Sequence, residues 1–170
     1  CSELLSHPDV IHEIHPKRLE TFVGSVLSDF FSTKVSVLGR TGDGGIDLVY
    51  VHSDTPFAVQ VKRRESASAR EGVSLVREFL GACVLSGYRN ARIVTTAHHF
   101  TRGAVATAHE TVERGLLDSF DLIARDTLLE YFRYSALANK YPWAPIARGW
   151  IHDWSDRSDA EITANDDYLR

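Results

Sequence analysis

The spacing of hydrophobic positions changes several times along this 170-residue chain. After Pro16, whose fixed φ suits a first helical position, apolar residues recur three and four positions apart as far as Phe30. This pattern predicts a helix with one apolar face. Similar spacing predicts further helices over about residues 71–86, 101–113 and 127–137, whereas residues 1–15 show no clear period.

Short β-rich segments alternate with these helices, and they predict strands over residues 35–38, 46–51, 57–62, 91–96 and 120–123. A polar turn joins the second and third segments, which predicts an antiparallel hairpin. The helix between the third and fourth makes them a parallel pair with a right-handed crossover. The sequence therefore predicts an α/β fold: a mixed β-sheet flanked by helices, in the order α-β-β-β-α-β with an additional α-β-α.

The composition is that of one globular domain, with 44% hydrophobic and 25% charged residues. No apolar run approaches the ~18 residues that a membrane-spanning helix needs, so we expect no contact with a membrane. Cys1 and Cys83 form no disulfide framework, which favours a reducing compartment, and Cys83 lies on an apolar helical face as an inert core thiol. The chain begins at Cys1 and lacks methionine, so we expect it to be part of a longer protein.

The strongest chemical signal is the segment Gly42-Asp43-Gly44-Gly45-Ile46-Asp47, followed by Gln60-Val61-Lys62. Gln60 and Lys62 share one face of a strand, and a lysine, an amide and an aspartate suit a divalent cation and a phosphate better than a core. Asp47 joins them only in one hairpin register, which the turn at residues 52–56 does not settle. Asp43 has two interpretations, a turn residue that accepts backbone hydrogen bonds or a contributor to the metal site.

Further motifs agree with this pair in order and spacing: Pro16…Leu19-Glu20…Val23…Val26-Leu27, Ile93-Val94-Thr95-Thr96, Phe100-Thr101…Ala104 and Ile123-Ala124-Arg125-Asp126. Together they resemble the Mrr-type restriction endonuclease catalytic domain of the PD-(D/E)xK nuclease superfamily. The resemblance implies a restriction-endonuclease-like core. It divides the chain into an N-terminal lead-in (1–15), the nuclease domain (16–130), and a C-terminal helix with an acidic, tryptophan-containing extension (131–170).

The resemblance implies catalytic roles for four residues. Asp47 corresponds to the metal-binding aspartate, and Gln60 stands where the wider superfamily has an acid, as is usual in the Mrr branch. Lys62 corresponds to the lysine that orients or activates the attacking water and offsets charge on the phosphate, and Glu20 completes the site. The implied cofactor is Mg²⁺, for which Mn²⁺ can substitute, held by Asp47, Gln60 and Glu20. Gln60 removes one negative charge from the site, which Glu20 could compensate.

The implied function is a metal-dependent DNA endonuclease, the cleavage domain of a restriction or anti-phage defence protein in the bacterial cytoplasm. Arg63, Arg64 and His98 are candidate contacts to the DNA backbone, although a solvated surface or loop would also explain them. The expected partners are DNA, a second copy for double-strand cutting, and further domains or a targeting subunit. Two alternatives stay open: a catalytically inactive nucleic-acid- or protein-binding domain of this fold, and a structure-selective nuclease resembling a junction resolvase.

The formal net charge of −4 does not count against a DNA substrate. Basic and acidic side chains balance over residues 1–114, and the whole acidic excess follows in residues 115–170. The predicted nuclease half is therefore almost neutral and contains the basic run at residues 62–64. Such a charge predicts a weak non-specific grip on DNA, because affinity follows the number of phosphates that are neutralised.

Overall fold

The structure, a computed structural model, describes residues 4, 6–38, 45–66 and 68–140. It contains two compact units, Cys1–Ser135 and Ala136–Arg170, and the architecture below is that of the first. Asp43, Cys1 and the tryptophan-containing segment, on which predictions were made above, lie outside the described residues.

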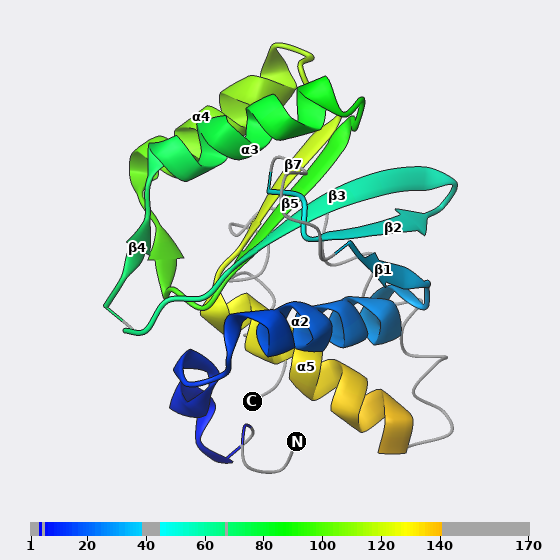
Figure 1. The fold of residues 1–170 in the computed structure, drawn as a ribbon, viewed down its shortest axis with the longest axis vertical. Helices are drawn as coiled ribbons and strands as arrows, with labels where there is room; N and C mark the ends of the chain where they lie inside the picture. Colours follow the sequence, from blue (N-terminus) through cyan, green and yellow to red (C-terminus); the bar gives the residue numbers. More distant parts are fainter. Residues whose placement is uncertain (1–3, 5, 39–44, 67, 141–170) are drawn as a thin grey trace, which may run out of the picture. The chain divides into compact units, whose positions relative to one another are not determined.

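The helices and strands follow one another as shown in Figure 1. The helices are the 3-10 helix η1 (Pro8–His12) and the α-helices α2 (Pro16–Phe31), α3 (Val73–Leu85), α4 (Arg102–Glu113) and α5 (Arg125–Lys140). The strands are β1 (Val35–Val37), β2 (Leu48–His52), β3 (Thr55–Lys62), β4 (Arg70–Glu71), β5 (Asn90–Thr95), β6 (His99–Phe100) and β7 (Ser119–Ile123).

The main sheet has five strands in the order β1-β2-β3-β5-β7. β1, β2 and β3 pair antiparallel, whereas β3, β5 and β7 run parallel, so β3 is the strand at which the sheet changes its sense. The short strands β4 and β6 form a separate parallel pair. The predicted α/β fold with a mixed sheet flanked by helices is thus confirmed.

Each face of the sheet has its own hydrophobic core. Alternate strand residues such as Leu48 and Val59 pack with α2 and the part of α5 up to Ser135. The opposite face, including Ala58 and Ile93, packs with α3 and α4. Figure 1 shows these two helix pairs on opposite sides of the sheet. No helix within the described residues is both long enough and apolar enough to cross a membrane.

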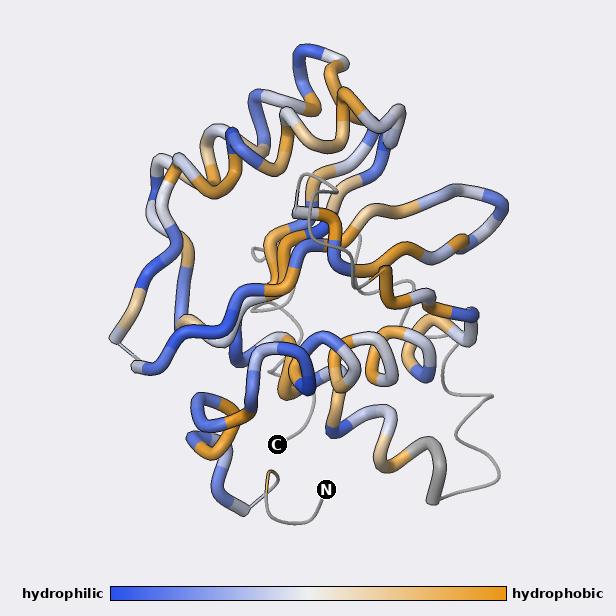
Figure 2. The backbone as a smooth tube through the Cα atoms, viewed as in Figure 1, coloured by the Kyte–Doolittle hydropathy of each residue, from blue (hydrophilic) through white to orange (hydrophobic). Residues whose placement is uncertain are grey.

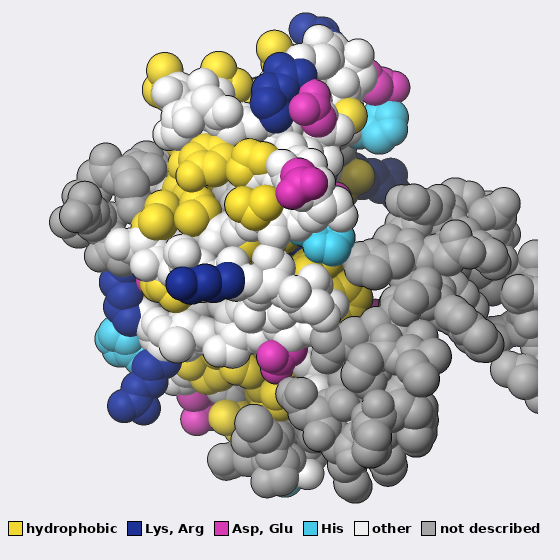
Figure 3. Space-filling view, turned by 90° about the vertical axis from the view of Figure 1, so that its right-hand side faces the viewer, with side chains coloured by type: hydrophobic (Ala, Val, Ile, Leu, Met, Phe, Trp, Pro, Cys, Tyr) yellow, Lys and Arg dark blue, Asp and Glu magenta, His cyan; other side chains and the backbone are white. Residues whose placement is uncertain are grey.

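Hydrophilic and hydrophobic residues are unevenly distributed along the chain and over the surface. Figure 2 shows that the chain turns hydrophilic where it leaves β3 on its way to β4. Figure 3 shows the side of the molecule at which the β2–β3 hairpin lies, where hydrophobic side chains gather in a patch. The large apolar side chains exposed in the described residues include those of Val37, Leu38 and Val51.

Local residues account for several of the helix ends. Pro16 occupies the first turn of α2, and the Thr101 side chain accepts a hydrogen bond from the Ala104 nitrogen at the start of α4. Gly87 has φ +75°, a conformation that glycine adopts readily, directly after α3 ends.

Three segments differ from the prediction, one of them being His99–Phe100, which form the unpredicted strand β6. Residues 8–12, for which no period was recognised, form η1 and bury Ile11 in the core. Glu71 was expected to begin a helix but lies in β4, because its carbonyl accepts the Thr101 N–H and its carboxylate is fully buried among polar partners. Gly72, in an extended conformation, then precedes the first residue of α3.

Candidate active site

Asp47 lies immediately before β2, where the regular ladder between β2 and β3 ends at Leu48 opposite Val59. Its N–H donates to the Val59 carbonyl at 2.9 Å, and its Oδ2 accepts a hydrogen bond of 2.7 Å from the Val61 nitrogen. The carboxylate thus bonds to a backbone group of β3 that lies between Gln60 and Lys62. This contact places Asp47 beside the other two predicted site residues, which the hairpin turn alone did not determine.

Gln60 is almost completely buried, with 5% of its surface exposed. Its Oε1 is a buried acceptor with no hydrogen-bond partner in the described residues. The amide also lies against the glycine-rich turn, since a Cβ added to Gly45 would come within 2.5 Å of Gln60 Nε2. Gly45 has φ +92°, so glycine is required here both for its backbone conformation and for the space that Gln60 occupies.

Glu20 projects from the first turns of α2, which Pro16 begins. It is 8% exposed, and its Oε2 accepts a hydrogen bond of 3.2 Å from Lys17 Nζ. A carboxylate so far removed from water needs a cationic partner, and Lys17 supplies one from the same helix. Helix α2 therefore presents an acid with one established cationic contact.

The electrostatics of Asp47 place these residues in one neighbourhood. Desolvation by burial raises the pKa of Asp47 above its usual value, and the negative charge of Glu20 raises it further. The Val61 N–H and the charges of Lys62 and Lys17 act in the opposite direction without cancelling the shift. An aspartate whose ionised form is disfavoured by burial and by a neighbouring carboxylate is one that a bound cation would stabilise.

Lys62 ends β3 opposite Thr95 of β5, and its carbonyl accepts the Thr96 N–H at 3.0 Å. Its side chain is half-buried, and its charge lowers the pKa of Asp47 and also that of Glu71. The charge of Lys62 thus lowers the pKa of two acids: Asp47 in the candidate site and Glu71 in β4.

A polar network centred on the buried Glu71 carboxylate lies near the end of β3. Its two carboxylate oxygens accept hydrogen bonds from Arg64 Nε at 2.8 Å and Arg64 Nη2 at 2.6 Å, and the Thr95 hydroxyl donates to it at 2.6 Å. Burial alone would raise the pKa of Glu71, but these hydrogen bonds and the charges of Arg64 and Lys62 hold it below its usual value. Sequence reasoning missed this network, because Glu71 appeared to continue the helical spacing of α3.

The three candidate DNA contacts all have partners within the protein. Arg63 Nη1 donates to the His12 carbonyl at 2.8 Å and its Nη2 to Glu65, while the Arg64 guanidinium binds Glu71 as described. His98 Nε2 lies 3.0 Å from Arg125 Nη1, and its Nδ1 lies 3.7 Å from Asp126. Contacts from these residues to DNA therefore remain a prediction.

The donor set fits a hard divalent cation, but only through mixed ligands. No group of three or more His, Cys, Asp or Glu side chains suited to a metal ion occurs within residues that the structure describes. Asp47 and Glu20 supply carboxylates, and the unpartnered Gln60 Oε1 supplies a neutral oxygen of the kind that Mg²⁺ accepts. Three protein ligands suit Mg²⁺, which keeps several of its bound waters.

Comparison with known proteins agrees with this geometry. Searches of curated proteins and of solved structures returned no match. A family model described as restriction endonuclease, the Mrr-type catalytic domain, matches residues 11–132, which is more than half of the chain and contains Glu20, Asp47, Gln60 and Lys62. The chain therefore belongs to the Mrr-type restriction endonuclease family and carries a nuclease domain of that family.

Proposed function

We propose that this protein hydrolyses phosphodiester bonds in DNA at the site formed by Asp47, Gln60, Lys62 and Glu20, with Mg²⁺ as cofactor and Mn²⁺ as a substitute. The observation that carries the proposal is the buried, unpartnered Oε1 of Gln60 next to the segment that binds the Asp47 carboxylate. A buried acceptor without a partner is uncommon, because its desolvation is not compensated. A cation ligand is one compensation that also uses the neighbouring carboxylates.

Each residue has a task that follows from its chemistry. Asp47, Gln60 and Glu20 would hold the cation through oxygen atoms, and Val61 keeps Asp47 oriented through its N–H. When bound, the cation would polarise the phosphodiester and make water at the site a stronger nucleophile. The Lys62 ammonium would stabilise the negative charge that develops on the phosphate and orient the attacking water.

The proposed biological role is restriction or defence against phage in the cytoplasm of a bacterium. The expected substrate is duplex DNA, with no membrane involved. Arg63, Arg64 and His98 are proposed as additional contacts to its backbone. Arg64 would have to do this while bound to Glu71. Sequence selection is proposed to come from further domains or a targeting subunit, because the nuclease half carries little net charge for a non-specific grip.

The direct test is cleavage of supercoiled plasmid by the purified protein in Mg²⁺, Mn²⁺ and EDTA, together with titration of Mn²⁺ into the protein. We expect cleavage only with metal, and loss of more than a hundredfold in rate for Asp47→Asn and Lys62→Met. Asp47→Asn should also weaken Mn²⁺ binding, whereas Lys62→Met should not, since lysine is no ligand.

Asp54→Asn is the matched control, because it makes the same chemical change in the β2–β3 turn. Asp54 has φ 61°, which asparagine tolerates, so this variant should cut at the parental rate. Absence of both cleavage and Mn²⁺ binding, with DNA binding retained, would establish the inactive binding domain instead. Cleavage of branched DNA in strong preference to plain or methylated duplex would establish a structure-selective nuclease.

A further inference from the structure

The 3-10 helix η1 contacts the end of the strand that carries Lys62. His12 Nδ1 lies 2.9 Å from the Arg64 carbonyl oxygen, and Arg63 Nη1 donates a hydrogen bond of 2.8 Å to the His12 carbonyl. Two hydrogen bonds thus join one residue of η1 to the two residues that directly follow Lys62. Through them η1 restrains the segment immediately after the candidate catalytic lysine.

The His12 ring contributes a hydrogen bond that an apolar side chain could not make. His12 is 7% exposed, and its Nδ1 carries the proton in the contact with Arg64, because a carbonyl oxygen can only accept. Its Nε2 is buried and has no hydrogen-bond partner among the described residues. Burying this nitrogen costs desolvation that an apolar side chain of similar size would avoid. The bond to the Arg64 carbonyl is therefore the contact for which a histidine is needed here.

Helix η1 is itself held in place, so it can act as a fixed support for the end of β3. Ile11 is fully buried in the core that includes α2, and Asp9 Oδ1 lies 2.8 Å from Arg125 Nη1 at the start of α5. Residues 13–15 connect η1 directly to α2, the helix that bears Glu20. The support is thus anchored to the core and is adjacent in sequence to the helix of the candidate acid.

The end of β3 depends on side-chain contacts, because its regular pairing with β5 stops at Lys62. Thr96 Oγ1 accepts the Arg64 N–H at 2.7 Å and donates to the Arg64 carbonyl at 3.1 Å. The Arg64 guanidinium binds Glu71, and His12 supplies a second donor to the same carbonyl. Three side chains from outside β3 therefore fix the backbone that follows the lysine.

We propose that His12 is a positioning residue: its hydrogen bond to the Arg64 carbonyl orders the end of β3 and thereby orients the Lys62 ammonium at the active site. The role in cleavage rests on the proposed nuclease function, whereas the ordering of the strand end does not. A misplacement of about 1 Å in an active site can lower the rate about a hundredfold. Because Thr96 still holds the same segment, loss of the His12 bond should cost less, about tenfold in kcat.

The first test compares His12→Leu with His12→Asn in steady-state plasmid cleavage with Mg²⁺, at a temperature where both are fully folded. Asparagine places an N–H close to the position of Nδ1, whereas leucine has no donor. We expect kcat of His12→Leu to fall about tenfold and that of His12→Asn to recover most of this loss. KM should stay unchanged, because both variants keep the His12 carbonyl that binds Arg63. A purely structural role would lower the urea midpoint without lowering kcat of the folded protein.

A double variant tests whether His12 acts through the lysine. In a Lys62→Met background, His12→Leu should lower the rate by less than about twofold, because the ammonium that His12 orients is absent and the two losses are not additive. An equal loss from His12→Leu in the parent and in the Lys62→Met background would show that His12 does not act through Lys62, and would overturn the proposal.

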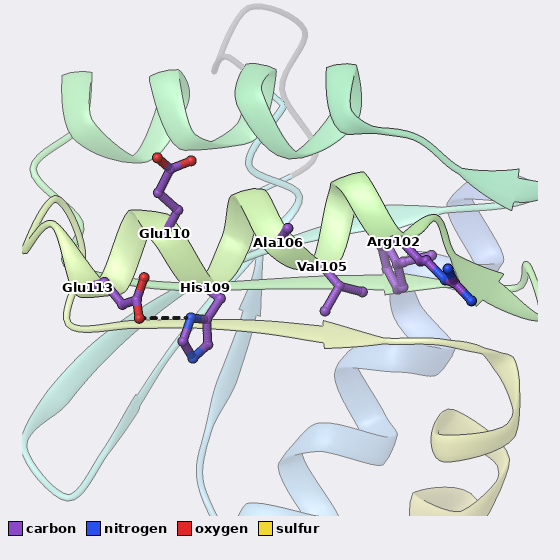
Figure 4. A pocket seen from close by; sticks show the side chains of 7 residues that line it. Arg102, Val105, Ala106, His109, Glu110 and Glu113 are labelled. Carbon is purple, nitrogen blue, oxygen red and sulfur yellow. Dashed lines mark ion pairs between the residues drawn. The ribbon is translucent and has the colours of Figure 1, made fainter.

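His109→Leu is the matched control, because it makes the same chemical change at a histidine outside the contacts described above. Figure 4 shows His109 on α4 beside Glu113, and its side chain is 74% exposed. Helix α4 packs on the face of the sheet opposite α2. This variant should keep the kcat and KM of the parent.

Hydrogen exchange of the Arg64 amide, measured by NMR without DNA, distinguishes this proposal from the proposed function. Exchange should be faster than in the parent for His12→Leu, and at the parental rate for His12→Asn and His109→Leu. Unchanged exchange in His12→Leu, parental kcat in His12→Leu, or an equal loss of kcat in both His12 variants overturns the positioning role. If the parent cuts no DNA while exchange responds as expected, the proposed nuclease function fails and the ordering of the strand end by His12 is upheld.

Discussion

Replacing Glu71 by glutamine should destabilise the protein at neutral pH, because the substitution removes the negative charge that binds Arg64. Removing one member of a buried ion pair costs about 3–5 kcal/mol when the remaining charge stays buried. Here the Glu71 side chain is fully buried but the Arg64 side chain is 41% exposed, so the arginine can regain water. Glutamine also keeps an acceptor for the Thr95 hydroxyl. We therefore expect a loss of about 2 kcal/mol, the value of a hydrogen-bonded charged group.

Urea denaturation measures this loss. With a slope of about 2 kcal/mol/M, the midpoint should fall by about 1 M. Because the pKa of Glu71 is lower in the folded protein than its ordinary value of 4.5, the stability it contributes is complete above that value and is lost as the pH falls through the folded pKa. The difference between parent and Glu71→Gln should therefore be full at pH 7 and shrink below about pH 4.5.

Glu78→Gln is the matched control, since it neutralises an exposed acid on α3 and should leave the midpoint unchanged. In the double variant R64M/E71Q, the losses should be smaller than the sum of the single losses, because the second change removes a charge that has already lost its partner. Equal midpoints for parent and Glu71→Gln at pH 7, or a difference that does not depend on pH, would refute the reasoning.

Three further predictions concern single positions. Gly45→Ala should cost about 2 kcal/mol, because its φ is positive and the new methyl group meets Gln60, and it should also slow plasmid cleavage. Cys83 is buried with its pKa raised to about 12, so in a Cys1→Ser background the native protein should resist a thiol reagent at pH 8 until urea unfolds it. Thr101→Ala should lower stability by about 1 kcal/mol in urea titrations, and Thr101→Ser should restore most of it.

The spacing of apolar residues predicted most of the helices and strands. Each helix packs one apolar face against the sheet, and the strands place side chains in the hydrophobic cores on its two faces. Val59 and Val61 alternate with Gln60 along β3, and this alternation is what made the strand and its polar face recognisable. The resemblance to the Mrr-type family then supplied the roles that are proposed for the site residues. Residue patterns and motifs were sufficient for features that depend on residues close together in the sequence.

Features that depend on distant partners could not be predicted in the same way. Glu71 is spaced like a helical residue, and only the guanidinium of Arg64 and the hydroxyl of Thr95 explain why it is buried in a strand. Asp47 lies just outside the regular pairing of β2 with β3 and its carboxylate accepts a hydrogen bond from Val61, so strand pairing alone could not place it. Ile11 is buried by α2 and its neighbours, although the segment around it has no period of its own.

The contact between Asp47 and Val61 has a consequence for the order in which the molecule folds. Both residues belong to one hairpin, so the contact forms by closing a short loop at a small cost in chain entropy. The parallel pairing of β3 with β5 closes a longer loop through α3, which costs more chain entropy. The acid, the amide and the lysine can therefore assemble early, as one local unit, and the rest of the sheet and the helix that bears Glu20 then close around them.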